Sequence, residues 1–341
     1  MSKKNIILGI ESSCDDTSAA IISNGFILSN IVANQKVHEK YGGVVPELAS
    51  RAHQQNIIPV VDTAIKEAGI KKEDLSAICF TQGPGLLGSL LVGSSFSKSF
   101  ALGMDIPLIA VNHMQGHIMA HFIKEEGTDN RQPKFPFLCL TVSGGHTQIV
   151  LVKSVENMTV IGETLDDAAG EAFDKSAKIL GLPYPGGPLI DKYGKDGDKL
   201  KFIFGKHKVG ELNFSYSGIK TSILRVIEKG VDENPNFIEE NLNDLCASIQ
   251  HTIVEILIKK IMKASKELDI NEIAIAGGVS ANSYLRSRLL ALQGKYNKQV
   301  YIPKFEYCTD NAAMIAISGY YKFLEGEFVE QSVTPKSRFK L

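Results

Sequence analysis

A strand hairpin that occurs twice constrains the fold of this chain more than any other feature of its sequence. Residues 6–11 and 19–22 are apolar runs that predict two strands joined by a polar turn. Residues 137–142 and 148–152 predict the same arrangement around a turn at 143–146. Strands joined by a short polar turn pair as antiparallel hairpins. The two hairpins therefore indicate that the chain contains a duplicated domain.

Each hairpin is followed downstream by a strand, a glycine turn and a helix. Residues 77–81 predict such a strand, and the helix is expected from about Gly88. Residues 272–276 predict its counterpart, with a helix from about Ser280 that either Ser280 or Asn282 would cap. Strands that alternate with helices are typical of α/β folds. We therefore predict an α/β fold of two duplicated domains with a cleft between them.

The duplication also predicts domain boundaries. The first domain is expected over residues 1–130 and the second over 131–309, because the polar stretch 127–136 separates the two copies. A helical pattern at about 310–330 is expected to pack back on the first domain. Residues from about 166 to 235 have no counterpart in the first half and are mostly helical in pattern, so we expect a helical insertion that closes over the cleft.

The composition is that of an ordinary soluble globular protein. The 341 residues are 44% hydrophobic and 22% charged, with a formal net charge of −1. A chain without a global basic field must contact RNA through a local patch or a partner. No apolar run is long enough for a membrane span, so no membrane association is expected. The cysteines have no CxxC spacing, which favours buried thiols in a reducing cytoplasm; they are Cys14, Cys79, Cys139, Cys246 and Cys308.

Two histidines four residues apart are the strongest chemical signal in the residues themselves. His113 and His117 fall in a helical pattern that runs to about Glu125, and residues i and i+4 share one face of a helix. Two imidazoles so placed can bind one metal ion, and His121 is a third histidine nearby. The zinc-protease motif H-E-x-x-H has the same spacing, but Met114 stands where its catalytic glutamate belongs. The pattern favours a metal site without peptidase chemistry, and two solvated helix histidines are the alternative.

Four glycine turns are candidates for anion binding. Glycine turns between strands and helices present backbone N–H groups and a helix N-terminus to an anion. One such turn alone is more often ordinary structure, but four in a duplicated α/β frame favour a bound phosphate compound. The sequence has neither a P-loop nor a Rossmann dinucleotide motif. The four turns contain Gly83 and Gly85, Gly144 and Gly145, Gly186 and Gly187, and Gly277 and Gly278.

The order of motifs along the chain resembles that of one family. The segments are GIESSCDD (9–16), GPGLLGSLLVG (83–93), NHMQGH (112–117), VSGGHT (142–147), GETLDDAAGEAFDK (162–175), YPGGPLID (184–191), FSYSGIKT (214–221), AGGVSAN (276–282) and CTDNAAMIA (308–316). They are similar to those of the bacterial tRNA N6-adenosine threonylcarbamoyltransferases, once named O-sialoglycoprotein endopeptidases. The resemblance implies the duplicated actin-like ATPase (ASKHA) fold that actin, the heat-shock ATPases and the sugar kinases share. Asp16 departs from the family's usual glutamate, and residues 335–339 are a loose version of its Pro-Arg-Trp ending.

The resemblance implies a metal site and a substrate site. His113, His117 and Asp310 would bind one divalent metal ion per subunit, with Fe(2+) preferred to Zn(2+). Asp310 is expected to begin a helix, where its other role would be that of N-cap. Without the resemblance, Asp174 would be interpreted as a helix-surface acid and Asn282 as a cap. The implied substrate-binding residues are Val142, Ser143, Gly144, Gly145 and His146 around the phosphate and acyl group, Asp174 and Asp191 on ribose hydroxyls, Gly187 beneath the nucleotide and Asn282 on adenine.

The resemblance also implies a reaction. A threonylcarbamoyl group would pass from threonylcarbamoyl-AMP to N6 of the adenosine just 3′ of the anticodon, in tRNAs that read codons starting with adenine. The product would be N6-threonylcarbamoyladenosine with release of AMP, and Asp15 is the candidate base for the amine. The implied partners are tRNA, a smaller paralogue of the same fold and a P-loop ATPase. The alternatives are a nucleotide-binding scaffold without transfer activity and a metallo-glycoprotease, which Met114 disfavours.

Overall fold

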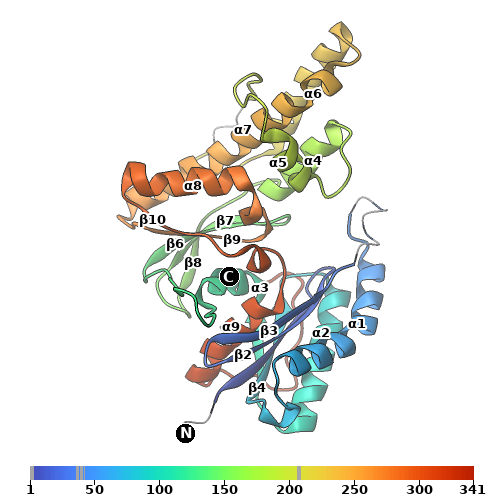
Figure 1. Ribbon diagram of the computed structural model, residues 1–341, viewed down its shortest axis with the longest axis vertical. Coiled ribbons are helices and arrows are strands. Elements are labelled where there is room, and N and C mark those ends of the chain that lie inside the picture. The colour runs from blue at the N-terminus through green and yellow to red at the C-terminus, as the bar shows by residue number, and fades with distance from the viewer. Residues whose placement is uncertain (1–3, 36–37, 39–40, 42, 206–208) are drawn as a thin grey trace. The chain divides into compact units, whose positions relative to one another are not determined.

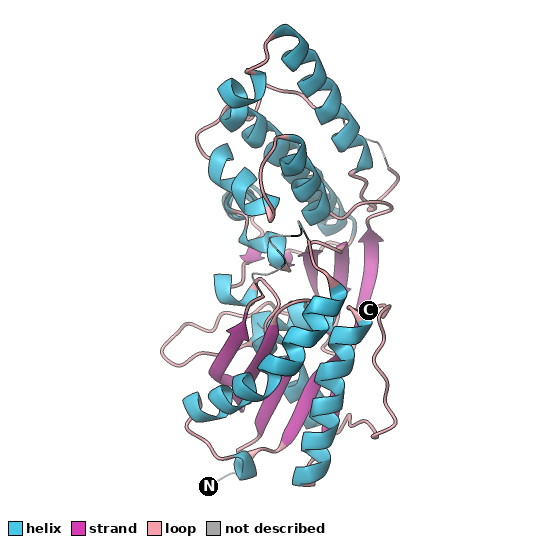
Figure 2. Ribbon diagram, turned by 90° about the vertical axis from the view of Figure 1, so that its right-hand side faces the viewer, coloured by secondary structure: helices cyan, strands magenta, loops and turns pink. Residues whose placement is uncertain are grey.

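The computed structural model divides into two compact units (Figure 1). Unit 1 comprises Met1–Gln132 and Pro303–Leu341, and unit 2 comprises Pro133–Ile302. Each unit is built on one five-stranded mixed sheet, and helices pack on both sheets (Figures 1 and 2). The residues that the structure describes are 4–35, 38, 41, 43–205 and 209–341.

The sheet of unit 1 joins an antiparallel meander to a parallel half. Its strands are β1 (Ile6–Glu11), β2 (Thr17–Ser23), β3 (Phe26–Ala33), β4 (Ala77–Gly83) and β5 (Leu108–Asn112). Their spatial order is β3-β2-β1-β4-β5. β1, β2 and β3 pair antiparallel, whereas β4 pairs in parallel with both β1 and β5. All residues of β1, β2 and β4 are buried, as expected for strands covered on both faces.

Helices cover the two faces of this sheet. They are α1 (Pro46–Glu67), α2 (Leu87–Met104), α3 (His113–Met119) and α9 (Ala312–Glu325), with short 3-10 turns η2 (Lys72–Asp74), η3 (Ala120–Phe122) and η5 (Phe305–Tyr307). Successive side chains of a strand point to opposite faces, so Leu8 and Ile10 enter the core shared with α1. On the other face α9 approaches β1 closely, since a Cβ added at Gly9 would lie 2.6 Å from the backbone nitrogen of Ala316.

The sheet of unit 2 repeats the same topology. Its strands are β6 (Phe137–Val142), β7 (Thr147–Val152), β8 (Met158–Glu163), β9 (Glu272–Ala276) and β10 (Gln299–Tyr301), in the order β10-β9-β6-β7-β8. β6 takes the place of β1, with an antiparallel neighbour on one side and a parallel neighbour on the other. The helices are α4 (Ala169–Ile179), α5 (Gly186–Gly194), α6 (Ser217–Glu233), α7 (Phe237–Glu267) and α8 (Ser283–Tyr296), with a 3-10 turn η4 (Gly278–Ala281). The predicted duplication of an α/β domain is confirmed.

Two expectations about the borders of elements are wrong. Residues 303–309 belong to unit 1, because Lys304 and Tyr307 both bond the Glu125 carboxylate through their side chains. The helix that starts at His113 does not run to about Glu125. It ends at Met119, and beyond the 3-10 turn the chain extends along β3, where the backbone of Lys124 exchanges hydrogen bonds with Gly25 and Ile27.

The interior of both units is apolar and contains free thiols. Four cysteines are buried and one is half-buried, as the scattered cysteine pattern predicted; the buried ones are Cys79, Cys139, Cys246 and Cys308, and the half-buried one is Cys14.

Within the described residues, no helix combines the length and the apolar content that crossing a membrane requires.

Candidate metal centre and ligand pocket

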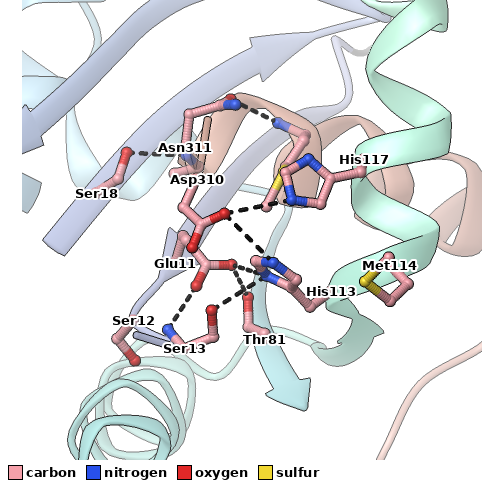
Figure 3. Close-up of polar contacts among 12 residues, drawn as sticks. Glu11, Ser12, Ser13, Ser18, Thr81, His113, Met114, His117, Asp310 and Asn311 are labelled. Carbon is pink, nitrogen blue, oxygen red and sulfur yellow. Dashed lines mark hydrogen bonds and ion pairs between the residues drawn. The ribbon is translucent and has the colours of Figure 1, made fainter. Parts of the chain in front are cut away.

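Three side chains of unit 1 converge on one point (Figure 3). α3 places His113 and His117 one turn apart, and its N-cap Asn112 accepts a hydrogen bond from the backbone N–H of Met114 at 2.8 Å. The Oδ1 atom of Asp310 lies 3.4 Å from Nε2 of His113 and 3.3 Å from Nε2 of His117. The two rings stand edge to face, with centroids 4.7 Å apart. The structure thus brings together the three residues that were expected to hold a metal.

The donor set fits a divalent transition metal. Potential ligand atoms of the two histidines and Asp310 lie within 4.8 Å of one another. Two imidazoles and one carboxylate suit iron or zinc and leave coordination positions open for a further ligand. Both histidines are buried, which holds their rings in place. His121, the third histidine of the run, is not a member of this group.

A buried carboxylate that the sequence analysis missed fixes the orientation of His113. Glu11, at the end of β1, is fully buried, and its Oε2 atom lies 3.1 Å from Nδ1 of His113. Glu11 itself accepts hydrogen bonds from the backbone N–H of Ser13 and the hydroxyl of Thr81, both at 2.5 Å. A carboxylate behind a ligand histidine holds the proton on Nδ1 and leaves Nε2 free for a metal.

The electrostatics of the cluster favour a cation between its carboxylates. Burial alone lowers the pKa of His113, but Asp310 and Glu11 together raise that pKa well above its ordinary value. Conversely, burial would raise the pKa of Asp310, and His113 and His117 hold it below its usual range. In the metal-free cluster the two carboxylates therefore favour the cationic form of His113. A metal ion would take the place of that positive charge.

Asp310 is not the cap of α9. The expectation that it begins a helix is wrong, because α9 starts at Ala312 and its N-cap is Asn311. The side chain of Asn311 accepts the hydrogen bond from the backbone N–H of Met314 at 3.1 Å. The Asp310 carboxylate thus remains available to the two histidines.

The structure, like the sequence, places no general base beside His113 at the position where a zinc peptidase has its glutamate. Met114, which follows His113, is a buried methionine with 2% of its surface exposed. A thioether cannot remove a proton from water.

Asp15, the candidate base for the amine, lies in the turn between β1 and β2 and is half-buried. The Asp15 side chain contacts the thiol of Cys14.

Unit 2 contains a cavity of about 280 Å³ at the ends of α4, α5 and η4. Five of the nine expected substrate-binding residues line it. Val142 is buried in β6, and Ser143, Gly145 and His146 form the following turn without lining the cavity. Phe173, Pro188 and Val279 also line it and were not anticipated. The five expected residues on its wall are Gly144, Asp174, Gly187, Asp191 and Asn282.

Two carboxylates of the cavity each accept hydrogen bonds from the N-terminus of another helix. Asp174 accepts hydrogen bonds at Oδ1 from the backbone N–H groups of Gly186 (2.8 Å) and Gly187 (3.1 Å), where α5 begins. Burial raises the pKa of Asp174, and these N–H donors oppose that rise. The interpretation as a surface acid is therefore wrong. Asp191 accepts from the backbone N–H (3.0 Å) and the hydroxyl (2.7 Å) of Ser283, the first residue of α8.

Asn282 is the N-cap of α8 and also lines the cavity. Its Oδ1 accepts a hydrogen bond from the backbone N–H of Leu285 at 2.8 Å. Its Nδ2 donates to Oε1 of Gln250 at 2.7 Å. An amide has two N–H donors, so one N–H of Asn282 remains for a ligand in the cavity.

The turn between β6 and β7 has the properties of an anion site. The backbone N–H of Ser143 donates to the carbonyl of His146 at 2.8 Å, which closes the turn. Gly144 and Gly145 are exposed, and a Cβ at either position would meet no atom within 4 Å. Their N–H groups donate to none of the described residues. Two open N–H groups beside a cavity are suited to a phosphate or an oxyanion.

Comparison with known proteins decides the family. Residues 26–317 match the profile of the TsaD family, described as tRNA N6-adenosine threonylcarbamoyltransferase. The chain belongs to this family. Proteins of that name from Christiangramia forsetii, Phocaeicola vulgatus and Porphyromonas gingivalis are 63%, 61% and 56% identical to it. The matches cover 98%, 95% and 99% of this chain and the same shares of the relatives.

Solved structures of more distant proteins share the fold. Full-length HypF in its phosphate- and nucleotide-bound form is 14% identical, with a TM-score of 0.62 over 96% of this chain and 48% of HypF. Component A of the (R)-2-hydroxyglutaryl-CoA dehydratase of Acidaminococcus fermentans is 16% identical, with a TM-score of 0.51 over 93% of this chain and 98% of that protein. The expected actin-like ATPase fold is therefore confirmed for this TsaD-family chain.

The acidic turn of this TsaD-family chain predicts a pH-dependent stability. Burial, Asp15 and Asp310 raise the pKa of Asp16 from 3.8 to about 7. The folded state thus binds the proton more tightly than the unfolded chain, and stability falls as the pH rises between these two values. We expect Asp16→Asn to raise the free energy of unfolding of the metal-free protein at about pH 8, by up to about 4 kcal/mol. The gain should shrink as the pH falls through about 7 towards 5.

Thermal melting of the chelator-treated protein and its Asp16→Asn variant at a series of pH values checks this expectation. A gain in Tm that does not change across the series would show that Asp16 is ionised throughout.

Proposed function

We propose that the protein transfers a threonylcarbamoyl group from threonylcarbamoyl-AMP to N6 of an adenosine in tRNA. The acceptor is the adenosine just 3′ of the anticodon in tRNAs that read codons starting with adenine. The products are N6-threonylcarbamoyladenosine and AMP. The observation that carries the proposal is the high similarity to tRNA N6-adenosine threonylcarbamoyltransferases over nearly the whole chain. Because the chain belongs to this family, it is a transferase.

The cluster in unit 1 supports a metal-dependent reaction. His113, His117 and Asp310 would hold one divalent ion, for which we propose Fe(2+), with Zn(2+) as the alternative that the same donor set allows. When bound, such an ion supplies Lewis acidity that offsets negative charge on a phosphate leaving group. Glu11 keeps His113 in the tautomer that presents Nε2. Burial of both imidazoles limits exchange of the site with bulk water.

The cavity in unit 2 supports binding of the adenylate part of the donor. Ionised carboxylates accept hydrogen bonds from hydroxyls, and Asp174 and Asp191 retain acceptor capacity beyond the contacts described above. We assign these two residues to the ribose hydroxyls. The remaining N–H of Asn282 is assigned to the adenine ring, and Gly187 to the wall beneath the nucleotide. Val142, Ser143 and His146 hold the turn that presents the two glycine N–H groups.

The bond changes define what these residues must do. The N6 nitrogen attacks the carbonyl carbon of the carbamoyl group, a C–N bond forms, and the C–O bond to the AMP phosphate breaks. The N–H groups of Gly144 and Gly145 would stabilise the oxyanion that forms on the carbonyl oxygen, and one such donor contributes about 2.7–4 kcal/mol in other enzymes. The amine proton must leave, and we assign its removal to Asp15.

The chain is proposed to act in the cytoplasm with other components. Its net charge of −1 provides no global attraction for tRNA. We therefore propose that a smaller paralogue of the same fold and a P-loop ATPase assist it, as the family resemblance implies.

Nucleoside analysis tests the proposal and separates it from its rivals. A strain depleted of its own enzyme should lose N6-threonylcarbamoyladenosine from tRNA, and this gene should restore the modification. A chain that restores growth without the modified nucleoside would be a nucleotide-binding scaffold. Cleavage of a glycoprotein by the wild-type protein, lost in His117→Ala, would instead identify a metallo-glycoprotease.

A further inference from the structure

A second and larger hollow of unit 2 is lined by residues of α7 and α8, both of which are labelled in Figure 1. Its volume is about 940 Å³, and both helices contribute to its walls. None of the residues assigned to the donor lines it. We call this hollow the basic groove, because six of its lining residues are lysine or arginine and only two are aspartate or glutamate.

The positive charge of the basic groove is concentrated and largely uncompensated. Arg288 is neutralised by Glu255, whose Oε1 lies 2.6 Å from the guanidinium Nε. Asp269 is the only other acidic residue of the lining. The chain as a whole has a net charge of −1, so this excess of cations is a local feature of one face. The five lysines of the lining are Lys259, Lys263, Lys266, Lys295 and Lys298.

The lysines of α7 form a row. Lys259, Lys263 and Lys266 are four and three residues apart, a spacing that places them on one face of the helix. All three are exposed, and Lys263 makes only a surface ion pair, at 3.4 Å, with Glu267. Such a surface pair contributes little free energy, so a bound phosphate could replace Glu267 as the partner of Lys263.

The charge of the groove favours a nucleic acid over a protein partner. Ile258 and Leu292 are buried, with 6% and 4% of their surfaces exposed, whereas Tyr296 exposes 47% of its surface in the same lining as the lysines. Interfaces between proteins have apolar or aromatic cores in which lysine is depleted. A row of exposed lysines is instead typical of surfaces that bind a phosphate backbone.

Hydrogen-bonded side chains connect the groove to the donor cavity. His251, which lines the groove, bonds the hydroxyl of Tyr284 through Nδ1 at 2.8 Å. Tyr284 lines a third hollow, of about 500 Å³, together with Lys195 and Lys199. That hollow also includes Ser283, which is held by a carboxylate of the donor cavity, that of Asp191. The start of α8 therefore connects all three hollows within unit 2.

We propose that the basic groove binds the phosphate backbone of the acceptor RNA away from the reacting adenosine. This inference rests on the proposed function, because it takes tRNA as the polyanion. Lysines contact phosphates without reading bases, so the groove contributes affinity and orientation rather than sequence selection. It provides the local patch that a chain without a global basic field needs.

The test compares two triple variants with equal change in net charge. The groove variant is Lys259→Gln, Lys263→Gln, Lys266→Gln, and glutamine matches lysine in helix propensity. The control variant is Lys153→Gln, Lys178→Gln, Lys220→Gln, at exposed lysines of unit 2 outside the groove. Binding of unmodified, fluorescently labelled tRNA is measured by anisotropy between about 50 and about 200 mM salt, without donor.

We expect the groove variant to bind at least about tenfold more weakly at the lower salt concentration, and the slope of log affinity against log salt to fall by about 2 to 3. The control should match the wild type. Equal losses in both variants, wild-type binding by the groove variant, or no binding by the wild-type chain would overturn the proposal. So would a groove variant that keeps its affinity for tRNA but loses an acidic protein partner.

The assay also separates this proposal from the proposed function. With donor and partner proteins present, the groove variant should show a raised KM for tRNA at an unchanged kcat. A wild-type chain that binds tRNA through the groove but forms no modified nucleoside would refute the transferase activity and leave the groove intact.

Discussion

Asp310→Ala is expected to abolish threonylcarbamoyl transfer and metal binding while the protein stays folded. The Asp310 carboxylate contributes the one anionic member of the group and lies within 3.4 Å of both imidazoles. Without it, two neutral imidazoles must hold a dication alone. Loss of a partner behind a ligand costs about 10–100-fold in metal affinity, and loss of a ligand itself should exceed that.

The neighbouring residue provides a matched control. Asn311→Ala removes the cap of α9, which is expected to lower stability by about 0.5–2 kcal/mol, and leaves all three metal-binding side chains in place. The two alanine variants should therefore differ in their metal content. Asp310→Ala should lose metal, and Asn311→Ala should retain metal while it lowers the Tm of the metal-free protein.

Elemental analysis, thermal melting and the transfer assay decide between the outcomes. The assay contains threonine, bicarbonate, ATP, the adenylate-forming synthase, the paralogue and the ATPase, with unmodified tRNA as acceptor. If Asp310→Ala melts normally, binds a full equivalent of metal and modifies tRNA at the wild-type rate, the assignment of Asp310 as a metal ligand is wrong.

The strands that could be predicted from the sequence are those that are buried on both faces. Residues 6–11 and 137–142 are continuous apolar runs, and they coincide with β1 and β6. The outer strands β3 and β8 were not anticipated. Most of their residues are only partly buried, so their sequences carry a weaker apolar signal. The repeat was therefore recognised from its central strands, and β3 and β8 were found only in the structure.

One helix start was predicted less well, because a glycine turn does not determine at which residue the following helix begins. The helix expected from about Ser280 begins at Ser283, since a 3-10 turn over Gly278–Ala281 comes first. Of the two candidate caps, Asn282 is the one used. The 31 residues of α7 were missed as one helix, and they form a wall of the basic groove.

Predictability of the site depended on distance along the chain. The pair His113 and His117 could be inferred because one helical turn brings i and i+4 together. Asp310 came only from the family resemblance, since no local pattern links it to α3. Glu11 was overlooked although a charged residue at the end of an apolar strand was visible, because its partner His113 is 102 residues away.

Glu11→Gln is expected to weaken metal binding by about 10–100-fold without unfolding the protein. The physical reason is the tautomer of His113. The carboxylate of Glu11 can only accept, so Nδ1 of His113 must carry the proton and Nε2 remains available. In the variant the backbone N–H of Ser13 can still bond the amide oxygen, which turns the amide N–H groups towards His113. Nδ1 must then accept, and the proton moves to Nε2, the atom that faces Asp310.

Ser13→Ala is the control for this prediction. The Ser13 hydroxyl also lies 3.1 Å from Nδ1 of His113, but it is neutral and can either donate or accept. Its loss should therefore leave the tautomer, and the metal affinity, close to those of the wild type. Competition with a chromophoric chelator gives the affinity of each variant, and ring-nitrogen chemical shifts of labelled histidine report which nitrogen of His113 carries the proton. Wild-type affinity in Glu11→Gln, with the proton still on Nδ1, would show that Glu11 serves only to stabilise the fold.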